Sequence, residues 1–202
     1  MTRVQKLKTE IFDAARSSGF VDPFTGHVPE SERALSGLLA FYGQRDRIDW
    51  AKVTLFDAKS QEAVSMAADF LIEPRGSYIS EYLLMHSTTE ELNLWGQMPA
   101  DMMYLSSDGA TAVLWENKVG SNIGYGPAPN ENQFARQLRY LQALRNRGSA
   151  IRRTAFVLVS GAAMLEANWY KGELQETLNH MPDVMTACYT VAWESIFRAK
   201  LG

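Results

Sequence analysis

Three residues near the middle of the chain could act together in metal-dependent chemistry: Asp101, Glu116 and Lys118. Two carboxylates can share a divalent cation, and an ammonium group beside them can orient a water molecule or stabilise negative charge on a phosphate. They form a site only if the chain folds so that the first carboxylate meets the other two groups. The sequence between them therefore decides whether a site exists.

That intervening sequence has the pattern of a β-hairpin. Two expected strands, residues 102–105 and 110–119, each with an apolar run, are joined by Ser-Ser-Asp-Gly. Asp-Gly between apolar runs is typical of a tight hairpin turn, because such a turn needs positive φ at its centre. We therefore expect a two-residue turn at Asp108-Gly109.

This turn fixes the register of the hairpin. Leu105 then faces Ala112, and Asp101 faces Glu116, with Cβ atoms about 4.5–5.5 Å apart. Lys118 lies two residues further along its strand and points to the same face. One turn thus gathers two carboxylates and an ammonium group, and a slip of one residue would separate them.

Adjacent carboxylates repel each other, so the arrangement needs compensating charge. Lys118 supplies part of it, and Mg²⁺ would supply more, because carboxylate oxygens are ligands that Mg²⁺ favours. The alternative is a surface salt bridge with a spare acid. Residues 112–115 are apolar on both faces, which indicates a strand covered on both sides whose polar end lies in a cleft or at a rim.

The pattern Pro99-Ala100-Asp101, a hairpin, then Glu116-Asn117-Lys118 resembles the PD-(D/E)XK motif of the restriction-endonuclease-like superfamily. It departs from the motif where Ala100 separates proline from aspartate. The resemblance implies that Asp101, Glu116 and the backbone carbonyl of Asn117 hold Mg²⁺, with Mn²⁺ able to substitute. It also implies a third acid, for which Glu81 and Glu32 remain open alternatives.

A second resemblance follows the hairpin. Residues 132–140 read Asn-Gln-Phe-Ala-Arg-Gln-Leu-Arg-Tyr, which is similar to the Q-x-x-x-Q-L-x-R-Y helix of several families in this superfamily. Gln133, Gln137 and Tyr140 share one helical face by spacing. The alternative is the polar flank of an amphipathic helix. The resemblance implies Gln137 in the catalytic set, and nucleic-acid contacts from Gln133, Arg136, Arg139 and Tyr140.

The elements that must position these residues belong to one α/β (α+β) domain over residues 1–202. The resemblance implies an αβββαβ core, with a mixed central sheet flanked by helices and extra N-terminal helices. Residues 1–77 are expected to be mainly helical and residues 78–202 to form the catalytic core. Patterning predicts helices over 4–17, 31–42, 60–72, 130–146, 162–178 and 193–200, strands over 102–105, 110–119, 154–160 and 184–191, and a strand then a helical turn over 78–91.

Charge is unevenly distributed along the chain. The net charge of −3 is unusual for a nucleic-acid binder, yet no acidic residue lies between Glu131 and Glu166. Arginine suits a phosphate backbone because it can donate two parallel hydrogen bonds. A solvated helix face and loop is the alternative interpretation. The arginines of this segment are Arg136, Arg139, Arg145, Arg147, Arg152 and Arg153.

The sequence thus predicts a Mg²⁺-dependent endonuclease acting on DNA, with RNA left open and a homodimer as a further option. A single cysteine, Cys188, allows no internal disulfide and fits a cytoplasmic protein. The sequence has no apolar run long enough to predict a membrane span. Two alternatives stay open: an inactive nuclease fold that binds nucleic acid or protein, and a coincidental hairpin in a protein that acts within a complex.

Overall fold

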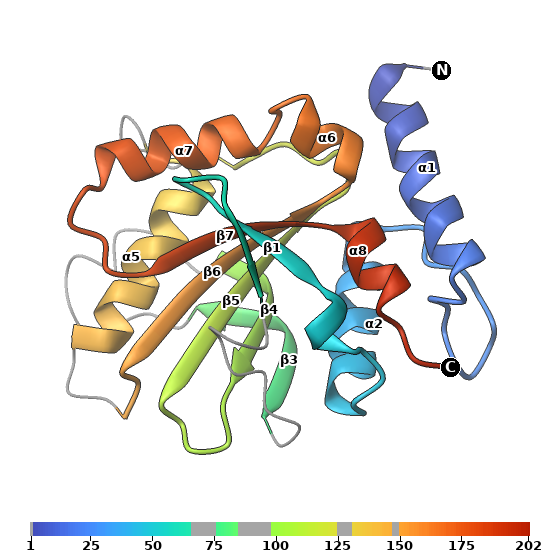
Figure 1. The fold of residues 1–202 in the computed structure, drawn as a ribbon, viewed down its shortest axis with the longest axis horizontal. Helices are drawn as coiled ribbons and strands as arrows, with labels where there is room; N and C mark the ends of the chain where they lie inside the picture. The colour runs from blue at the N-terminus through green and yellow to red at the C-terminus, as the bar shows by residue number, and fades with distance from the viewer. Residues whose placement is uncertain (1, 66–75, 85–97, 125–130, 147–149) are drawn as a thin grey trace.

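The protein is described here by a computed structural model that covers residues 2–65, 76–84, 98–124, 131–146 and 150–202 (Figure 1). These residues form a seven-stranded mixed sheet with the strand order β2-β1-β7-β6-β5-β4-β3. The three central strands run parallel, and every other neighbouring pair is antiparallel. The predicted α/β class, with a mixed sheet flanked by helices, is confirmed. The strands are β1 (Thr54–Asp57), β2 (Ala63–Ser65), β3 (Ser77–Leu84), β4 (Met98–Leu105), β5 (Thr111–Lys118), β6 (Arg153–Ser160) and β7 (Ala187–Ala192).

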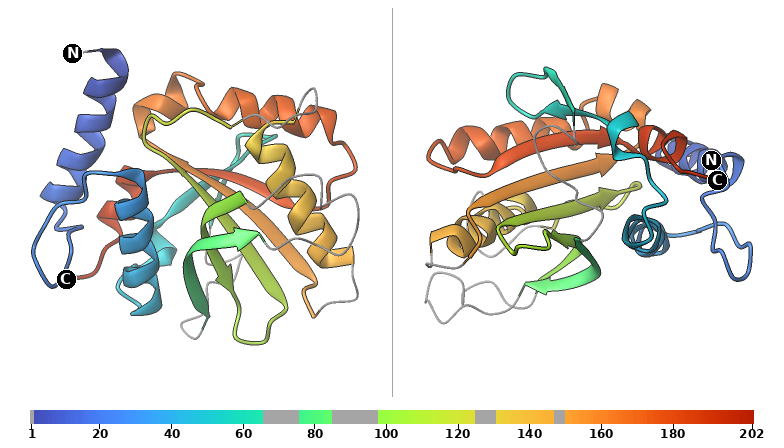
Figure 2. Two further views of the ribbon diagram at one scale, coloured as in Figure 1. Left: turned by 180° about the vertical axis from the view of Figure 1, so that it is seen from behind. Right: turned by 60° about the horizontal axis from the view of Figure 1, so that its bottom comes forward.

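The helices gather in two groups around the sheet. Figures 1 and 2 show α1, α2 and α8 on the side of the molecule where both chain termini lie, with α5 and α7 on the other side. The described helices are α1 (Arg3–Ser17), α2 (Glu32–Gln44), η1 (Trp50–Lys52), α5 (Gln133–Asn146), α6 (Ala162–Glu166), α7 (Lys171–His180) and α8 (Trp193–Arg198). Over the ranges that the structure covers, no helix is both long and apolar enough to cross a membrane.

The central strands form the core because their side chains are apolar on both faces. Every residue of β5 is buried, and in β6 only Arg153 is exposed. Such continuous burial is typical of parallel strands covered by helices on both sides. Polar residues at the ends of these strands are therefore held by a rigid framework.

The hairpin of β4 and β5 has the predicted register. Leu105 pairs with Ala112, and Met103 pairs with Leu114. The turn itself differs from the prediction. Residues 107–110 form a four-residue loop in which the Gly109 N–H donates to Ser106 O at 2.9 Å, and only Gly109 has positive φ, at 67°. The register is unchanged because the longer loop is centred on the same two residues.

The prediction of a helix over residues 60–72 is wrong for the part of this segment that the structure describes. Residues 63–65 form strand β2, which pairs with β1, and residues 66–72 lie outside the described ranges. Strand β1 in turn pairs with β7, so the described part of residues 1–76 adds β1 and β2 to the sheet. Pairing with a neighbouring strand has overridden the helix-like apolar spacing.

Two other predictions are refined. The helix predicted over 162–178 is divided into α6 and α7, with Asn168 between them in the left-handed region at φ 60°. The first part of 78–91 is a strand as predicted, and residues 85–91 lie outside the described ranges.

Candidate functional site

The candidate site lies at the carboxyl end of β5. Pairing with β4 on one side and β6 on the other fixes the strand there, and Lys118 is level with Ser160 of β6. Ligands of open α/β sheets bind beyond the carboxyl ends of parallel strands. Because successive residues alternate faces, Glu116 and Lys118 point one way and Asn117 points the other.

Glu116 is the centre of the cluster, with only 1% of its surface exposed. Its Oε1 accepts hydrogen bonds from Lys118 Nζ and from Gln133 Nε2, both at 2.7 Å. Its Oε2 accepts one from Gln137 Nε2 at 2.5 Å. Gln133 and Gln137 are one turn apart on α5, so their amides reach the same carboxylate, as their spacing predicts.

Asp101 joins this cluster from β4. Its Oδ2 accepts a hydrogen bond from the Asn117 N–H at 2.7 Å, where the ladder of paired residues between β4 and β5 has ended at Met102 and Trp115. Burial, and then the charge of Glu116, raise the pKa of Asp101 to about 8. The two carboxylates therefore interact electrostatically, as the hairpin register implies.

Asn117 connects the cluster to the opposite face of the sheet. Its Nδ2 donates to Ser36 Oγ of α2 at 2.7 Å, and its buried Oδ1 has no partner among the described residues. Since Glu116 bonds to α5 from the other face, α2 and α5 cover opposite faces at this point. The two helices are thus tied to successive residues of one strand.

Glu32, in the first turn of α2, is the third acid that the fold brings to the cluster. Its Oε1 lies 3.9 Å from Lys118 Nζ, and its Oε2 accepts from the Val119 N–H at 2.6 Å. Ser121 Oγ donates to both of its oxygens, at 2.8 Å each. Glu81 instead forms an ion pair with Arg33. Of the two alternatives that the sequence leaves open, Glu32 adjoins Lys118.

The cluster holds three carboxylates and one ammonium group. Burial raises the pKa of Glu116 even though Lys118 lowers it in part. Burial alone would lower the pKa of Lys118, but Glu116, Glu32 and Asp101 together raise it above its ordinary value. Lys118 is therefore charged, and the excess of carboxylates is offset by the proton that the raised pKa of Asp101 favours or, in its place, would be offset by a divalent cation.

The donor set suits a hard cation in its chemistry, because Asp101, Glu116 and Glu32 all present carboxylate oxygens. Within the described ranges, however, no three acidic, histidine or cysteine side chains are grouped closely enough to hold a metal ion. In addition, both oxygens of Glu116 already accept hydrogen bonds. Metal binding would therefore require at least one of these bonds to be exchanged.

The residues of α5 that were predicted to contact nucleic acid differ in exposure and in partners. Tyr140 is 7% exposed, and Arg139 forms an ion pair with Glu131. Arg136 Nη2 donates to Gly124 O at 3.4 Å. Arg153 lies at the start of β6, level with Thr111 and thus at the far end of the sheet from Lys118.

Sequence reasoning missed Ser36 and Ser121, the hydroxyl partners of Asn117 and Glu32. Ser36 follows Glu32 by four residues, so helical spacing places both on the same side of α2. That signal was available once Glu32 was assigned to the site. Ser121 has no comparable sequence signal, because it is 89 positions from Glu32 and meets it only when the chain folds.

Comparison with known proteins adds no identification. No protein-family model matches the chain, and no characterised protein or solved structure is significantly similar to it. The functional conclusion therefore rests on the chemistry of the cluster.

Proposed function

We propose that this chain is a metal-dependent nuclease of the restriction-endonuclease-like class that hydrolyses phosphodiester bonds in DNA. The observation that carries the proposal is the convergence of Asp101, Glu116, Lys118 and Glu32 at the carboxyl end of β5. Two carboxylates from a hairpin, a third from a helix and a buried ammonium group are the kinds of group that metal-assisted phosphoryl chemistry uses.

The order of elements supports the proposal. Among the described elements, the series α2-β3-β4-β5-α5-β6 is consistent with the αβββαβ order that the motif implies, with η1, β1 and β2 following α2. Asp101 lies on β4, and Glu116 and Lys118 lie on β5, so the motif residues come from two neighbouring strands of this series. The helix with the two glutamines covers the same face as Glu116.

The chain's own groups have distinct roles in this proposal. Asp101, Glu116 and the backbone carbonyl of Asn117 would hold Mg²⁺ or Mn²⁺, with Glu32 as the further acid. The bound ion would activate water and polarise the phosphate. Lys118 stabilises negative charge on the phosphate, while Gln133 and Gln137 orient the Glu116 carboxylate, as hydrogen-bonded neighbours of a metal ligand commonly do.

Asp101→Asn is the variant that tests this proposal most directly. An asparagine can keep the acceptor for the Asn117 N–H while removing the charge. We expect Mg²⁺-dependent nicking of plasmid DNA to fall by about a hundredfold or more, equivalent to about 3 kcal/mol in the barrier. Circular dichroism should show an unchanged fold.

Asp108→Asn is the matched control, because Asp108 lies at the other end of the same hairpin. It should cleave like the wild type. Wild-type activity in Asp101→Asn, or equal losses in both variants, would rule out the site assignment. Parallel assays on RNA establish which nucleic acid is preferred.

A second candidate function is a nuclease fold that binds nucleic acid without cutting it. It is favoured by one observation, the full engagement of both Glu116 oxygens by Lys118, Gln133 and Gln137. DNA binding that survives EDTA, with no nicking in Mg²⁺ or Mn²⁺, would support this candidate over the enzyme.

A further inference from the structure

Arg136 carries a positive charge that the described residues leave without an acidic partner. It lies in the first turn of α5 and is half-buried, and its buried Nε has no hydrogen-bond partner within the described ranges. The hydrogen bond that it does form runs from Nη2 to Gly124 O at a long 3.4 Å. Burial lowers the pKa of Arg136. A desolvated cation of this kind is costly unless an anion accompanies it.

The acids that precede Arg136 in the sequence already have other partners. Glu131 forms an ion pair with Arg139, and both oxygens of Glu116 accept hydrogen bonds from the cluster. Residues 117–130, which connect Glu116 to Glu131, include no acidic residue. The missing partner of Arg136 is therefore best supplied from outside the chain.

The position of Arg136 on α5 adds to the imbalance of charge. The N-terminal end of a helix carries the positive end of its dipole, so an anion is favourable there and a cation is not. The first turn of α5 contains no acidic residue that would compensate. A residue that breaks a local rule without a compensating contact is expected at a functional site, so Arg136 points to a ligand rather than to stability.

Gln133 connects Arg136 to the candidate site. Its Nε2 donates to Glu116 Oε1 at 2.7 Å, and its Oε1 accepts from Lys118 Nζ at 3.3 Å. A Cβ built on Gly124 would lie 4.0 Å from the same Oε1 and 3.6 Å from Arg136 Nη2. The guanidinium therefore lies beside the amide that contacts both Glu116 and Lys118.

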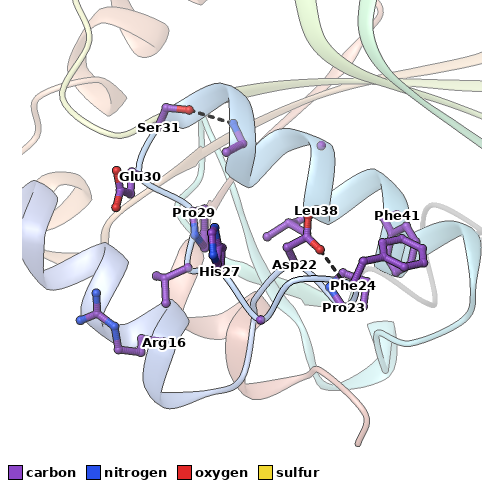
Figure 3. Close-up of a pocket in the computed structure, with 14 residues that line it drawn as sticks. Arg16, Asp22, Pro23, Phe24, His27, Pro29, Glu30, Ser31, Leu38 and Phe41 are labelled. Carbon is purple, nitrogen blue, oxygen red and sulfur yellow. Dashed lines mark hydrogen bonds between the residues drawn. The ribbon is translucent and has the colours of Figure 1, made fainter.

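The hollow between α1, the loop that follows it and α2 offers no comparable cation (Figure 3). Its volume is about 910 Å³, and its lining includes the carboxylates of Asp22 and Glu30. The arginine of its lining, Arg16, already donates to Asp13 Oδ1 at 2.6 Å. An anion is therefore better accommodated at Arg136 than in this hollow.

We propose that Arg136 binds a backbone phosphate of the nucleic-acid substrate, next to the phosphate that the cluster would hold. The identity of this anion rests on the proposed function. Arginine suits such a partner because its planar guanidinium can donate two parallel hydrogen bonds to phosphate oxygens. A phosphate contact fixes the position of the substrate and is independent of its base sequence.

Fluorescence anisotropy of a labelled DNA duplex in EDTA, measured over a series of salt concentrations, tests this contact without cleavage. Arg136→Met keeps the aliphatic stem and removes the charge, so binding should weaken about tenfold, as for the loss of one charge-assisted hydrogen bond. The slope of log K against log salt concentration should become shallower by about 0.9, because one phosphate contact is lost. Arg136→Lys keeps the charge and should keep the slope.

Arg198→Met is the matched control. It changes the net charge by the same amount, and Arg198 is exposed on α8, on the other side of the molecule from α5 (Figures 1 and 2). It should bind DNA with the slope of the wild type. Equal changes in Arg136→Met and Arg198→Met would reflect net charge alone and would overturn the proposal.

Thermal unfolding without DNA separates a binding role of Arg136 from a structural one. Arg136→Met should melt at the temperature of the wild type or above it, because it removes an unpaired charge from the positive end of a helix. A lower melting temperature together with wild-type DNA binding would assign Arg136 to the fold and overturn the phosphate contact.

Failure of the phosphate contact and failure of the nuclease give different results. If the wild type binds DNA and only Arg136→Met loses affinity and slope, the contact is supported even when no cleavage occurs. If the wild type cleaves DNA but Arg136→Met binds it with an unchanged slope, the contact is overturned and the nuclease stands. Absence of DNA binding by the wild type also overturns the contact.

Discussion

Glu116 and Lys118 are both buried, and Lys118 Nζ lies 2.7 Å from Glu116 Oε1. Removing two charges from water is costly, so such a pair is stable only when hydrogen bonds complete it. Here Gln133 and Gln137 supply those bonds to Glu116. The pair therefore fixes the shape of the site. Replacing only one partner should lower the free energy of unfolding more than replacing both.

Lys118→Met tests this coupling. The change keeps the length of the side chain but leaves Glu116 buried without its cation, so the free energy of unfolding should fall by about 3–5 kcal/mol at pH 8. The double variant Lys118→Met/Glu116→Gln should recover part of that loss. Urea unfolding of both variants measures the difference, and equal losses would show that the pair does not act as a unit.

Asp101 should make the stability of the metal-free protein depend on pH. Its pKa is raised from 3.8 to about 8, mainly by burial, so the folded state holds this proton more tightly than the unfolded chain does. Stability from this group is complete below pH 3.8 and is lost as pH rises toward 8. Each pH unit in that window lowers the free energy of unfolding by at most about 1.4 kcal/mol.

Urea unfolding in EDTA at pH 5, 6, 7 and 8 measures this dependence. Asp101→Asn removes the titrating group and should flatten the curve. Glu116, whose pKa is raised in the same direction, will keep part of the slope. A variant curve as steep as that of the wild type would show that Asp101 does not hold its proton in the folded state.

The choice between Glu32 and Glu81 shows the limit of sequence reasoning for single residues. Local patterning places Asp101 opposite Glu116, because one turn fixes that register. Glu32, however, reaches Lys118 across 86 positions of sequence, through the packing of α2 on the sheet. No periodicity in the sequence encodes that approach.

Helix α2 offers a test of packing at the scale of one element. A side chain added at Gly37 would meet open space, whereas one added at Gly43 would meet the Tyr78 ring. Gly37→Ala should raise the free energy of unfolding by about 0.5–1 kcal/mol, since the new methyl group meets open space. Gly43→Ala should lower it by about 1–3 kcal/mol, because the methyl group would overlap the Tyr78 ring. Thermal unfolding of the two variants compares them directly, and changes of the same sign would contradict this description of α2.

The hairpin of β4 and β5 was predictable from sequence because its information is local. Apolar runs on both sides of one Asp-Gly turn are enough to specify the strands and their register. Strands β1 and β2 were not predictable in this way, because they are four and three residues long. Strand β1 pairs with β7, which lies more than a hundred residues further along the chain, and β2 pairs in turn with β1.

For the whole molecule, the candidate site joins elements that are distant in sequence. Glu32 comes from α2, Asp101 from β4, Glu116 and Lys118 from β5, and the two supporting glutamines from α5. These carboxylates lie close together only in the folded protein, so a ligand that contacts all of them binds only the folded state. A cation held at the site should therefore stabilise the entire fold by mass action.

Mn²⁺ should accordingly raise the melting temperature of the wild type. At about a hundred times the dissociation constant the gain is about 2.7 kcal/mol, which corresponds to roughly 5–10 °C for a domain of this size. The rise should be larger at pH 8.5 than at pH 6.5, because a metal ligand must lose its proton and the pKa of Asp101 is about 8.

Differential scanning fluorimetry of the wild type, Asp101→Asn and Asp108→Asn measures this linkage. Asp108→Asn should follow the wild type, while Asp101→Asn should lose most of the rise at both pH values. An equal rise in Asp101→Asn would place the cation elsewhere on the protein. No rise in the wild type would mean that the hydrogen bonds on Glu116 are not exchanged for a metal, which favours the non-catalytic binding function over the nuclease.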